Sequence, residues 1–592
     1  MRYRISFPDP HTHLVHVEAT LEAPAAAQEV CFPVWTPGSY LVREFARHVE
    51  GLSAVDGGGR PVPVERQDKQ RVRLAAGGAG SVTLRYRVYA NDLTVRTSHV
   101  DGTHAFLNGA NLFPFAPGRE GEPCQLEVAA PPGWRVSTAL EGGPERFTAR
   151  DYDELVDSPI EIGTHRLVPF AAGGKPHALA IWGSGRVDEA RLAEDTRRIV
   201  ETFAALMGGL PYDRYLFIVH LTDKRRGGLE HARSTTVSVS RKGFHPREAY
   251  EETLGLLSHE FFHVWNVKRL RPAALVPFDY GREQYTRLLW WFEGATSYYE
   301  GLALARAGLV SPPRYLKALG KAFTQLERTP GARKMSLEEA SFLAWVKHYR
   351  PDENSGNSAV SYYLKGELVA FALDLLLRRH GRSLDELLRA LYARHAEEEG
   401  GVPEAAVEGM VAELVPPADA RRFFDAFVRG TEPLAAALER EGLELLGLRL
   451  RRRAAQALDD KGGAPGKPDN GGDGEAPVPG WLGLELAPGP RLVVSAVREG
   501  SPAARAGLYA EDELVAEGGF RIDRGALWDR LCEEGPGGTL RLTVFRRDEL
   551  TELTVPLAPP PEDTIWLEPA SGASEAQRAA FQAWCGQPFP AP

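Results

Sequence analysis

The sequence predicts a multidomain protein: an N-terminal all-β sandwich, a mostly helical domain with a small β-sheet, and a second small β-rich domain near the C-terminus. Three observations predict this fold class. The chain has 592 residues, more than a single hydrophobic core usually holds. The spacing of its apolar residues changes from alternation to a helical period near Val187. Residues 454–479, rich in Gly, Pro, Asp and Lys, then interrupt the apolar pattern, and we expect a flexible linker there.

Residues 1–172 are expected to form the β-sandwich. Apolar and polar side chains alternate along residues 82–89, and less regularly along residues 12–19, as they do in strands with one buried face. Glycine clusters at residues 57–59 and 77–80 supply the positive φ values that hairpin turns require. These segments therefore predict hairpins within one β domain.

Residues 173–453 are expected to form the mostly helical domain. Its first helix should open at Asp188 and Glu189 and end at Gly208, because acidic residues favour a helix start and glycine favours a helix end. Short runs at residues 215–221 and 234–240 are apolar or β-branched and indicate strands. The apolar positions that recur at helical spacing in the first helix are Leu192, Thr196, Ile199, Phe203 and Leu206.

Composition and charge argue against several kinds of partner. With 70 basic and 80 acidic residues the formal net charge is −10, and no basic block is long enough to indicate nucleic acid binding. The four cysteines are far apart in the sequence, which predicts free thiols rather than disulfides or a thiolate zinc site. No apolar run has the length of a membrane span or the form of a signal peptide, so we expect a cytoplasmic protein. The oligomeric state is left open.

The run His259-Glu260-Phe261-Phe262-His263 indicates a metal site. It lies in a stretch expected to be helical from about Pro246 to Arg271, because proline suits the first helical position and Pro272 disfavours helix just before it. In a helix the two imidazoles stand one turn apart, so both can bind one zinc ion with Glu260 beside it. The alternative is a buried helix whose histidines bond to neighbouring groups.

A catalytic zinc site of this kind needs a third protein ligand, for which a carboxylate is expected. Residues 290–305 have the composition of a second buried helix. Within it Glu293 is the preferred ligand, because the small residues Gly294 and Ala295 would let the two helices approach each other. Glu300 is its rival, since it lies seven residues on and on nearly the same helical face.

The partners of the ligand histidines cannot be named from the sequence. A zinc-bound imidazole usually passes its other N–H to a carboxylate or carbonyl group. The residue one turn after Glu293 is Ser297, so this acceptor must come from elsewhere in the chain.

Residues 259–272, together with residues 291–299, resemble the glycyl aminopeptidase family of zinc metallopeptidases, which are thermolysin-like gluzincins. Residues 33–40, Pro-Val-Trp-Thr-Pro-Gly-Ser-Tyr, match the β domain of that family. The resemblance implies a thermolysin-like catalytic domain over residues 173–453 and a C-terminal PDZ domain. It also implies one Zn²⁺ per chain, held by His259, His263 and Glu293, with Glu260 as the general base.

Two further motifs resemble the related aminopeptidase N group. Residues 227–231, Gly-Gly-Leu-Glu-His, resemble its exopeptidase motif, which implies that Glu230 binds the free amine of a peptide substrate. A carboxylate pairs with an α-ammonium group, which an internal peptide bond lacks. Lys365-Gly366 resembles the end of a Tyr-x-Lys-Gly stretch, which implies that Tyr363, rather than Tyr362, stabilises the oxyanion. The alternatives are an ordinary edge-strand glutamate and a buried structural tyrosine.

Residues 480–560 resemble a PDZ domain closely. By that resemblance the loop Trp481, Leu482, Gly483 and Leu484 offers backbone N–H groups to the terminal carboxylate of a C-terminal peptide ligand. The alternative is a packing module whose groove is filled by its own chain. Residues 561–592 are expected to be a C-terminal tail.

Three functions are compatible with these motifs. The first is an aminopeptidase that removes N-terminal residues, with the preference for small Gly or Ala residues implied by the resemblance. The second is an endopeptidase to which the PDZ-like domain guides longer substrates. The third is a peptide-binding scaffold with a structural metal, against which Glu260 argues, because a structural site needs no general base.

Overall fold

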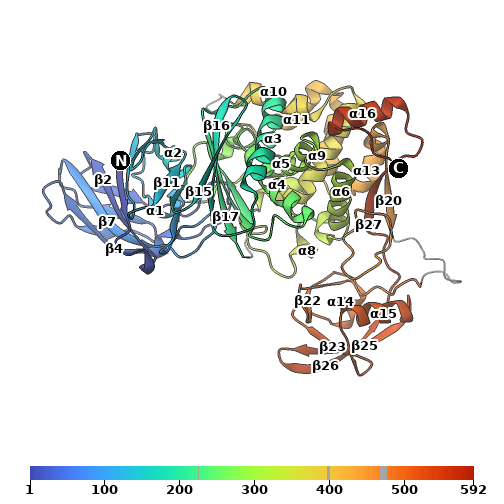
Figure 1. The fold of residues 1–592 in the computed structure, drawn as a ribbon. Helices are drawn as coiled ribbons and strands as arrows, with labels where there is room; N and C mark the ends of the chain where they lie inside the picture. Colours follow the sequence, from blue (N-terminus) through green and yellow to red (C-terminus); the bar gives the residue numbers. More distant parts are fainter. Residues whose placement is uncertain (224–225, 397–399, 467–476, 592) are drawn as a thin grey trace. The chain divides into compact units, whose positions relative to one another are not determined.

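The computed structural model describes residues 1–592 except residues 224–225, 397–399, 467–476 and 592 (Figure 1). The chain divides into two compact units. The first unit comprises Met1–Thr286, Tyr299–Leu309 and Leu388–Ala406. The second unit comprises Arg287–Tyr298, Val310–Leu387 and Val407–Pro592. Each unit is therefore built from segments that are separated in the sequence.

The first part of the first unit is a β-rich domain, as predicted. Its sheets have the strand orders β12-β13-β10-β1-β2-β7-β4, β11-β14-β9-β8 and β3-β6-β5. β7 alternates buried and more exposed side chains along most of its length, as its sequence predicts. The strands are β1 (Arg2–Ser6), β2 (Leu14–Glu22), β3 (Gln28–Cys31), β4 (Val49–Asp56), β5 (Val64–Arg66), β6 (Arg71–Leu74), β7 (Ser81–Tyr89), β8 (His99–Val100), β9 (His104–Leu107), β10 (Cys124–Ala129), β11 (Arg135–Thr138), β12 (Glu141–Gly142), β13 (Arg146–Ala149) and β14 (Ile160–Gly163), with helices α1 (Gly109–Leu112) and α2 (Tyr152–Val156).

A five-stranded sheet follows, with strand order β15-β16-β17-β19-β18. β15 pairs with β16 along its whole length, so this strand belongs to the second sheet although the expected boundary at residue 172 would separate the two. The helices α3 and α4 pack on this sheet (Figure 1). The bounds are β15 (Arg166–Ala172), β16 (Lys175–Trp182), β17 (Tyr215–Thr222), β18 (Gly227–Glu230), β19 (Ser234–Ser240), α3 (Glu189–Met207) and α4 (Arg247–Phe262).

The predicted boundaries of α3 are confirmed. The Asp188 side chain accepts a hydrogen bond from the backbone N–H of Arg191, and Gly208 ends the helix with a φ of 82°. Asp188 therefore caps the helix start, and glycine takes the left-handed conformation that a helix end often needs. The five periodic side chains of this helix are all buried.

α4 begins after Pro246, as predicted, but it ends at Phe262 rather than near Arg271. The chain turns back at this point, because the N–H of Asn266 donates to the carbonyl of Phe262 and the N–H of Lys268 donates to that of His263. Val267 has a φ of 137°, an uncommon value for a β-branched residue. Pro272 thus set only the latest position at which the helix could stop.

The second predicted buried helix is present with an unexpected first turn. Trp290–Ala295 is π-helical and runs directly into the α-helix α5 (Thr296–Arg306). The helical patterns expected up to about residue 440 are also present. The remaining helices of this region are α6 (Pro312–Glu327), α7 (Leu337–Phe342), α8 (Ser355–Ser358), α9 (Tyr362–Arg379), α10 (Leu384–His395), α11 (Ala406–Leu414), α12 (Pro417–Phe427) and α13 (Leu434–Glu441).

The C-terminal part of the second unit contains a small β-rich module and a returning segment. The module has the strand order β21-β22-β23-β25-β26, and β24 pairs with β23. β27, which lies in the segment expected to be a C-terminal tail, pairs with β20 from before the module. The bounds are β20 (Leu448–Arg453), β21 (Leu484–Leu486), β22 (Leu492–Val497), α14 (Pro502–Ala506), β23 (Glu513–Glu517), β24 (Phe520–Arg521), α15 (Arg524–Glu534), β25 (Thr539–Arg546), β26 (Glu549–Pro556), β27 (Thr564–Pro569) and α16 (Glu575–Cys585).

Residues 456–463, at the start of the expected linker, form defined hydrogen bonds. Asp460 accepts hydrogen bonds from the backbone N–H groups of Gln456 and Gly462, and the N–H of Gly463 donates to the carbonyl of Ile565 in β27. Residues 467–476, which belong to the expected linker, lie outside the described residues.

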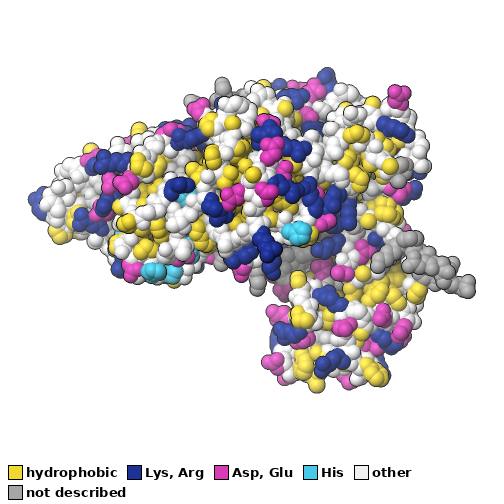
Figure 2. Space-filling view, viewed as in Figure 1, with side chains coloured by type: hydrophobic (Ala, Val, Ile, Leu, Met, Phe, Trp, Pro, Cys, Tyr) yellow, Lys and Arg dark blue, Asp and Glu magenta, His cyan; other side chains and the backbone are white. Residues whose placement is uncertain are grey.

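All four cysteines are free thiols, as predicted. In the described part of the chain, no helix combines the length and apolar character that crossing a bilayer requires. On the face shown in Figure 2, basic and acidic side chains are interspersed.

Candidate active site

The two motif histidines lie at the C-terminal end of α4. Their ring centroids are 4.8 Å apart, and the ring planes are inclined by 80°. Both side chains are buried, with 8% of His259 and 1% of His263 exposed. This spacing of one helical turn is the arrangement that the sequence predicted.

Each histidine ring is held through its Nδ1 atom. His259 Nδ1 lies 3.2 Å from Oε2 of Glu300, and His263 Nδ1 lies 2.7 Å from the backbone carbonyl of Asn266. Because both partners accept hydrogen bonds, each Nδ1 carries the proton and each Nε2 carries the lone pair. These are the acceptors that the sequence could not name, and they leave both rings in the tautomer that binds a metal through Nε2.

Close approach of α4 to Glu300 depends on Gly255. A Cβ atom at Gly255 would lie 2.6 Å from Oε1 of Glu300, and the Ser258 hydroxyl donates to the backbone carbonyl of Glu300 at 3.0 Å. The sequence-based expectation placed this role on Gly294. Gly294 instead faces α9, where a Cβ atom would lie 2.5 Å from the Cα of Gly366.

Glu260 lies beside the edge strand β18. One donor atom from each of Glu230, Glu260 and His263 lies within 4.8 Å of the others, and all three side chains are buried. A Cβ atom at Gly228 of β18 would lie 1.9 Å from Oε1 of Glu260, so only glycine leaves room for this carboxylate. Two carboxylates at such close range repel each other in a buried site and require cationic partners.

A loop of the N-terminal β domain closes on Glu230. A Cβ atom at Gly38, which has a φ of 85°, would lie 2.5 Å from Oε1 of Glu230. The loop is anchored at both the backbone and a side chain: the N–H of Val34 donates to the carbonyl of Tyr280, and the indole N–H of Trp35 donates to that of Asp279. In the sequence, residues 33–40 indicated only a resemblance to the β domain of the family. The sequence did not predict that this loop lies against Glu230.

The end of β18 is tied down by Asp157. This carboxylate accepts hydrogen bonds from His231 Nδ1 at 3.1 Å, the N–H of Ala232 at 2.8 Å and Lys268 Nζ at 2.6 Å. Burial raises the pKa of Asp157, but the charge of Lys268 and the contact with His231 outweigh this effect and hold it well below its ordinary value. Lys268 therefore has a structural role, because its partner Asp157 also holds His231, the residue that follows Glu230.

Glu293 and Tyr363 lie together in the second unit. Glu293 is buried in the π-helical turn with 2% of its surface exposed, and Tyr363 lies in the first turn of α9. Burial raises the pKa of Tyr363, and the negative charge of Glu293 raises it further. The ring of His348 stacks on that of Tyr363 with centroids 5.3 Å apart. Tyr362, the alternative, is completely buried.

Comparison with known proteins identifies the family. The Peptidase M61 N-terminal domain matches residues 2–164, and the M61 glycyl aminopeptidase domain matches residues 252–369. An aminopeptidase N family protein from Idiomarina loihiensis is 32% identical, and its crystal structure superposes with a TM-score of 0.90 over 99% of both chains. The chain belongs to the M61 glycyl aminopeptidase family.

This M61 protein is accordingly a zinc metallopeptidase, which confirms the predicted enzyme class and the predicted family. An M1 zinc metallopeptidase from Deinococcus radiodurans superposes with a TM-score of 0.46 at 14% identity, over 73% of this chain and 93% of that chain. No curated protein matches the sequence.

The loop Trp481 to Leu484 of the M61 protein borders a small cavity. The backbone of Trp481 pairs with Ala558, and the carbonyl of Gly483 accepts from the N–H of Arg498. The cavity has a volume of about 80 Å³, and Leu458 of the preceding segment also lines it. The chain itself therefore forms part of the wall beside this loop.

Proposed function

We propose that this M61 protein is a zinc-dependent aminopeptidase that removes small N-terminal residues from peptides. The observation that carries the proposal is the buried group formed by Glu230, Glu260 and His263. A lone general base would explain one carboxylate beside a metal-binding histidine. The second carboxylate, on the edge strand, is explained by a substrate that brings its own positive charge, as a free amine does.

The donor chemistry fits zinc. His259 and His263 both present Nε2, since Glu300 and the Asn266 carbonyl occupy their Nδ1 atoms. We assign Glu293 as the third ligand of one Zn²⁺ per chain. Its π-helical turn is continuous with α5, which carries Glu300 to His259, and such turns are frequent at functional sites. Glu300 is then a positioning residue and not a ligand.

When bound, zinc supplies Lewis acidity that polarises the scissile carbonyl and lowers the pKa of a bound water. Glu260 takes the proton of the attacking water and then delivers it to the leaving amine. Glu230 pairs with the substrate's α-ammonium group and so fixes which peptide bond is cut. Tyr363 donates its hydroxyl proton in a hydrogen bond to the carbonyl oxygen as this oxygen gains negative charge.

The preference for small N-terminal residues follows from the loop against Glu230. Gly38 leaves no space for a side chain of its own beside that carboxylate. Residues 33–37 and Ser39 are buried and Gly38 is half-buried, so the loop is supported from behind and resists displacement by a bulky substrate side chain. We therefore propose Gly or Ala as the residue removed.

The β-rich module of residues 480–560 is proposed to be PDZ-like. Support comes from its sheet, its helices α14 and α15, and the cavity beside Trp481 to Leu484. A C-terminal peptide is the proposed ligand, and a PDZ-guided endopeptidase is the alternative function that this module favours. A cytoplasmic location is proposed because all four cysteines are free thiols.

Two substitutions test the function. Glu260→Gln should lower turnover by at least about 100-fold while zinc content, measured by mass spectrometry, is unchanged. Glu252→Gln, on the exposed face of the same helix, is the matched control and should behave as the wild type. Equal turnover of Glu260→Gln and wild type would contradict the mechanism.

The exopeptidase assignment is tested with a peptide and its N-acetylated twin. The wild type should cleave only the free-amine peptide at an appreciable rate. In Glu230→Gln the ratio of the cleavage rate of the free-amine peptide to that of the acetylated peptide should fall by at least about tenfold. Equal cleavage of both peptides by the wild type would favour endopeptidase action instead.

A further inference from the structure

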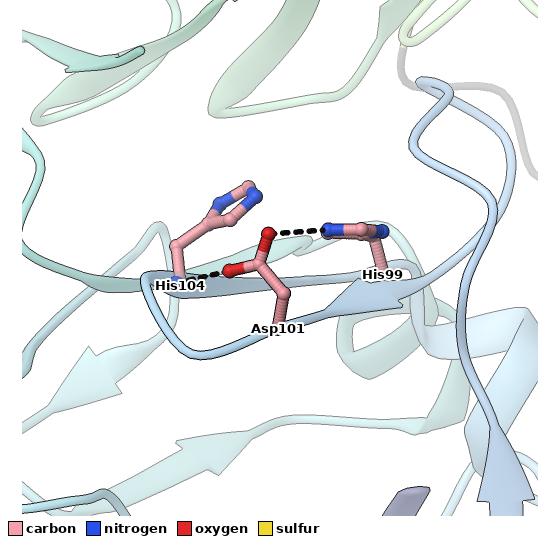
Figure 3. Close-up of side chains that lie close together, drawn as sticks. All are labelled: His99, Asp101 and His104. Carbon is pink, nitrogen blue, oxygen red and sulfur yellow. Dashed lines mark hydrogen bonds and ion pairs between the residues drawn. The ribbon is translucent and has the colours of Figure 1, made fainter. Parts of the chain in front are cut away.

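A second group of potential metal ligands lies in the N-terminal β domain, on the hairpin of β8 and β9. His99 pairs with Phe106 and Val100 with Ala105, and the N–H of Asp101 donates to the carbonyl of His104 at 2.9 Å. In this register, His99, Asp101 and His104 project from the same face of the hairpin. Figure 3 shows the Asp101 carboxylate between the two imidazole rings.

The turn of the hairpin fixes the Asp101 carboxylate. Its Oδ1 atom accepts from the N–H and the hydroxyl of Thr103, each at 2.7 Å, and from the N–H of His104 at 3.1 Å. Its Oδ2 atom lies 3.2 Å from His99 Nε2. One oxygen is thus used to shape the turn, and the other is directed at the imidazole.

The Glu161 carboxylate holds His104 so that the lone pair of the imidazole points away from this carboxylate. His104 Nδ1 lies 3.0 Å from Oε1 of Glu161, and the other oxygen of Glu161 lies 2.9 Å from His220 Nε2. The ring stacks on Trp182 with centroids 3.5 Å apart and planes within 10°. Because Glu161 accepts from Nδ1, the lone pair is on Nε2. This nitrogen is completely buried and has no hydrogen-bond partner among the described residues.

We propose that His99, Asp101 and His104 bind a divalent first-row transition metal such as Zn²⁺, at a site separate from the peptidase centre. One donor atom from each residue lies within 4.8 Å of the others. The 3.2 Å between Asp101 Oδ2 and His99 Nε2 is close to the separation of ~3.3 Å between ligands that each lie ~2 Å from a tetrahedral zinc ion. Two imidazoles and one carboxylate suit this class of metal better than Mg²⁺ or Ca²⁺.

The surroundings are those of a metal site. Glu161 and His104 form a carboxylate–histidine pair of the kind that orients ligand histidines. A cavity of about 290 Å³ reaches the group at His99, and Trp182, Asp223 and Arg241 are among its other lining residues. Glu161 lies on β14 and His220 on β17, so the metal would reinforce the contact between the β-rich domain and the five-stranded sheet.

Metal titration of the full-length protein tests the site independently of the proposed peptidase function. Protein stripped with a chelator is titrated with Co²⁺ or Zn²⁺, and bound metal is counted by mass spectrometry. The wild type should bind two ions. His99→Gln and Asp101→Asn should each weaken binding of one ion by at least about 100-fold while peptidase turnover of the zinc-loaded protein stays within about twofold. His16→Gln, a histidine on β2 of the same domain, is the control and should bind two ions.

A second readout uses Trp182. Co²⁺ quenches nearby indole fluorescence, and the quenching linked to this site should disappear in Trp182→Phe and in His99→Gln. If His99→Gln and Asp101→Asn bind metal with the wild-type stoichiometry and affinity, the contact between His99 and Asp101 is a simple hydrogen bond and the proposal is wrong. A wild type that binds only the ion lost in His263→Gln would overturn it equally.

Discussion

Nδ1 of His259 lies 3.2 Å from Oε2 of Glu300, a residue that follows it by more than forty positions in the chain. From its sequence position Glu300 was the rival of Glu293 as a zinc ligand, whereas this contact makes it the acceptor for the Nδ1 proton of His259. Since Glu300 accepts the Nδ1 proton, it orients the imidazole, and in the proposed site it does so without being a zinc ligand. The backbone carbonyl of Asn266 does the same for His263.

Glu300→Gln should therefore weaken zinc binding about 10- to 100-fold without abolishing it, because the ring loses the charge of its acceptor but keeps a hydrogen-bond partner. Glu293→Gln should lose zinc more completely, since it removes a proposed ligand. Competition with a chromogenic chelator measures both affinities. The reverse order of the two effects would show that Glu300 is the ligand and Glu293 the positioning residue.

Gly228→Ala should lower kcat by at least about 100-fold with little change in thermal stability, because its Cβ would displace the Glu260 carboxylate. Gly227→Ala is the matched control: its Cβ would lie 3.4 Å from the nearest atom, Nη1 of Arg96, and ordinary turnover is expected. Steady-state kinetics and a melting curve for each variant give the comparison. Parallel losses in the two variants would point to a general effect on β18 rather than to Glu260.

Gly38→Ala should raise KM for free-amine peptides, since its Cβ would meet Glu230 and move it from the amine position. The change also strains the backbone, because Gly38 has a φ of 85°. Gly59→Ala controls for that strain: its φ is 81° and no atom lies within 4 Å of the added Cβ. We expect Gly59→Ala to lose some stability and to keep its KM. If KM increased by the same amount in both variants, the effect of Gly38→Ala would come from backbone strain, and Gly38 would have no specific role in recognition of the amine.

Stability at alkaline pH should depend on Lys365. Burial lowers the pKa of Lys365 from its ordinary value of 10.5 to about 8. Between pH 8 and pH 10.5 the Lys365 side chain binds more protons in the unfolded chain than in the folded chain. The free energy of unfolding therefore increases as the pH rises through this range. Denaturant unfolding at pH 8 and pH 10 should show wild type gaining about 1–2 kcal/mol relative to Lys365→Met. A constant difference between the two proteins would contradict the assigned shift.

The sequence by itself determined the elements whose signals are local. The helical spacing and the caps at Asp188 and Gly208 defined α3, and the spacing of His259 and His263 placed two imidazoles on one turn of α4. Helical periodicity and capping depend on residues three or four apart, so a single stretch of sequence contains the whole signal. The alternation in residues 82–89 defined β7 for the same reason.

Only the tertiary structure decided which distant residues meet. It placed Glu300 on His259, Gly38 against Glu230, and His104 beside Glu161, and it paired β27 with β20. It also ended α4 at Phe262, because the chain folds back to bring the Asn266 carbonyl to His263. Such contacts depend on loop closure and on the mutual fit of packed surfaces, which leave no periodic trace in the segments involved.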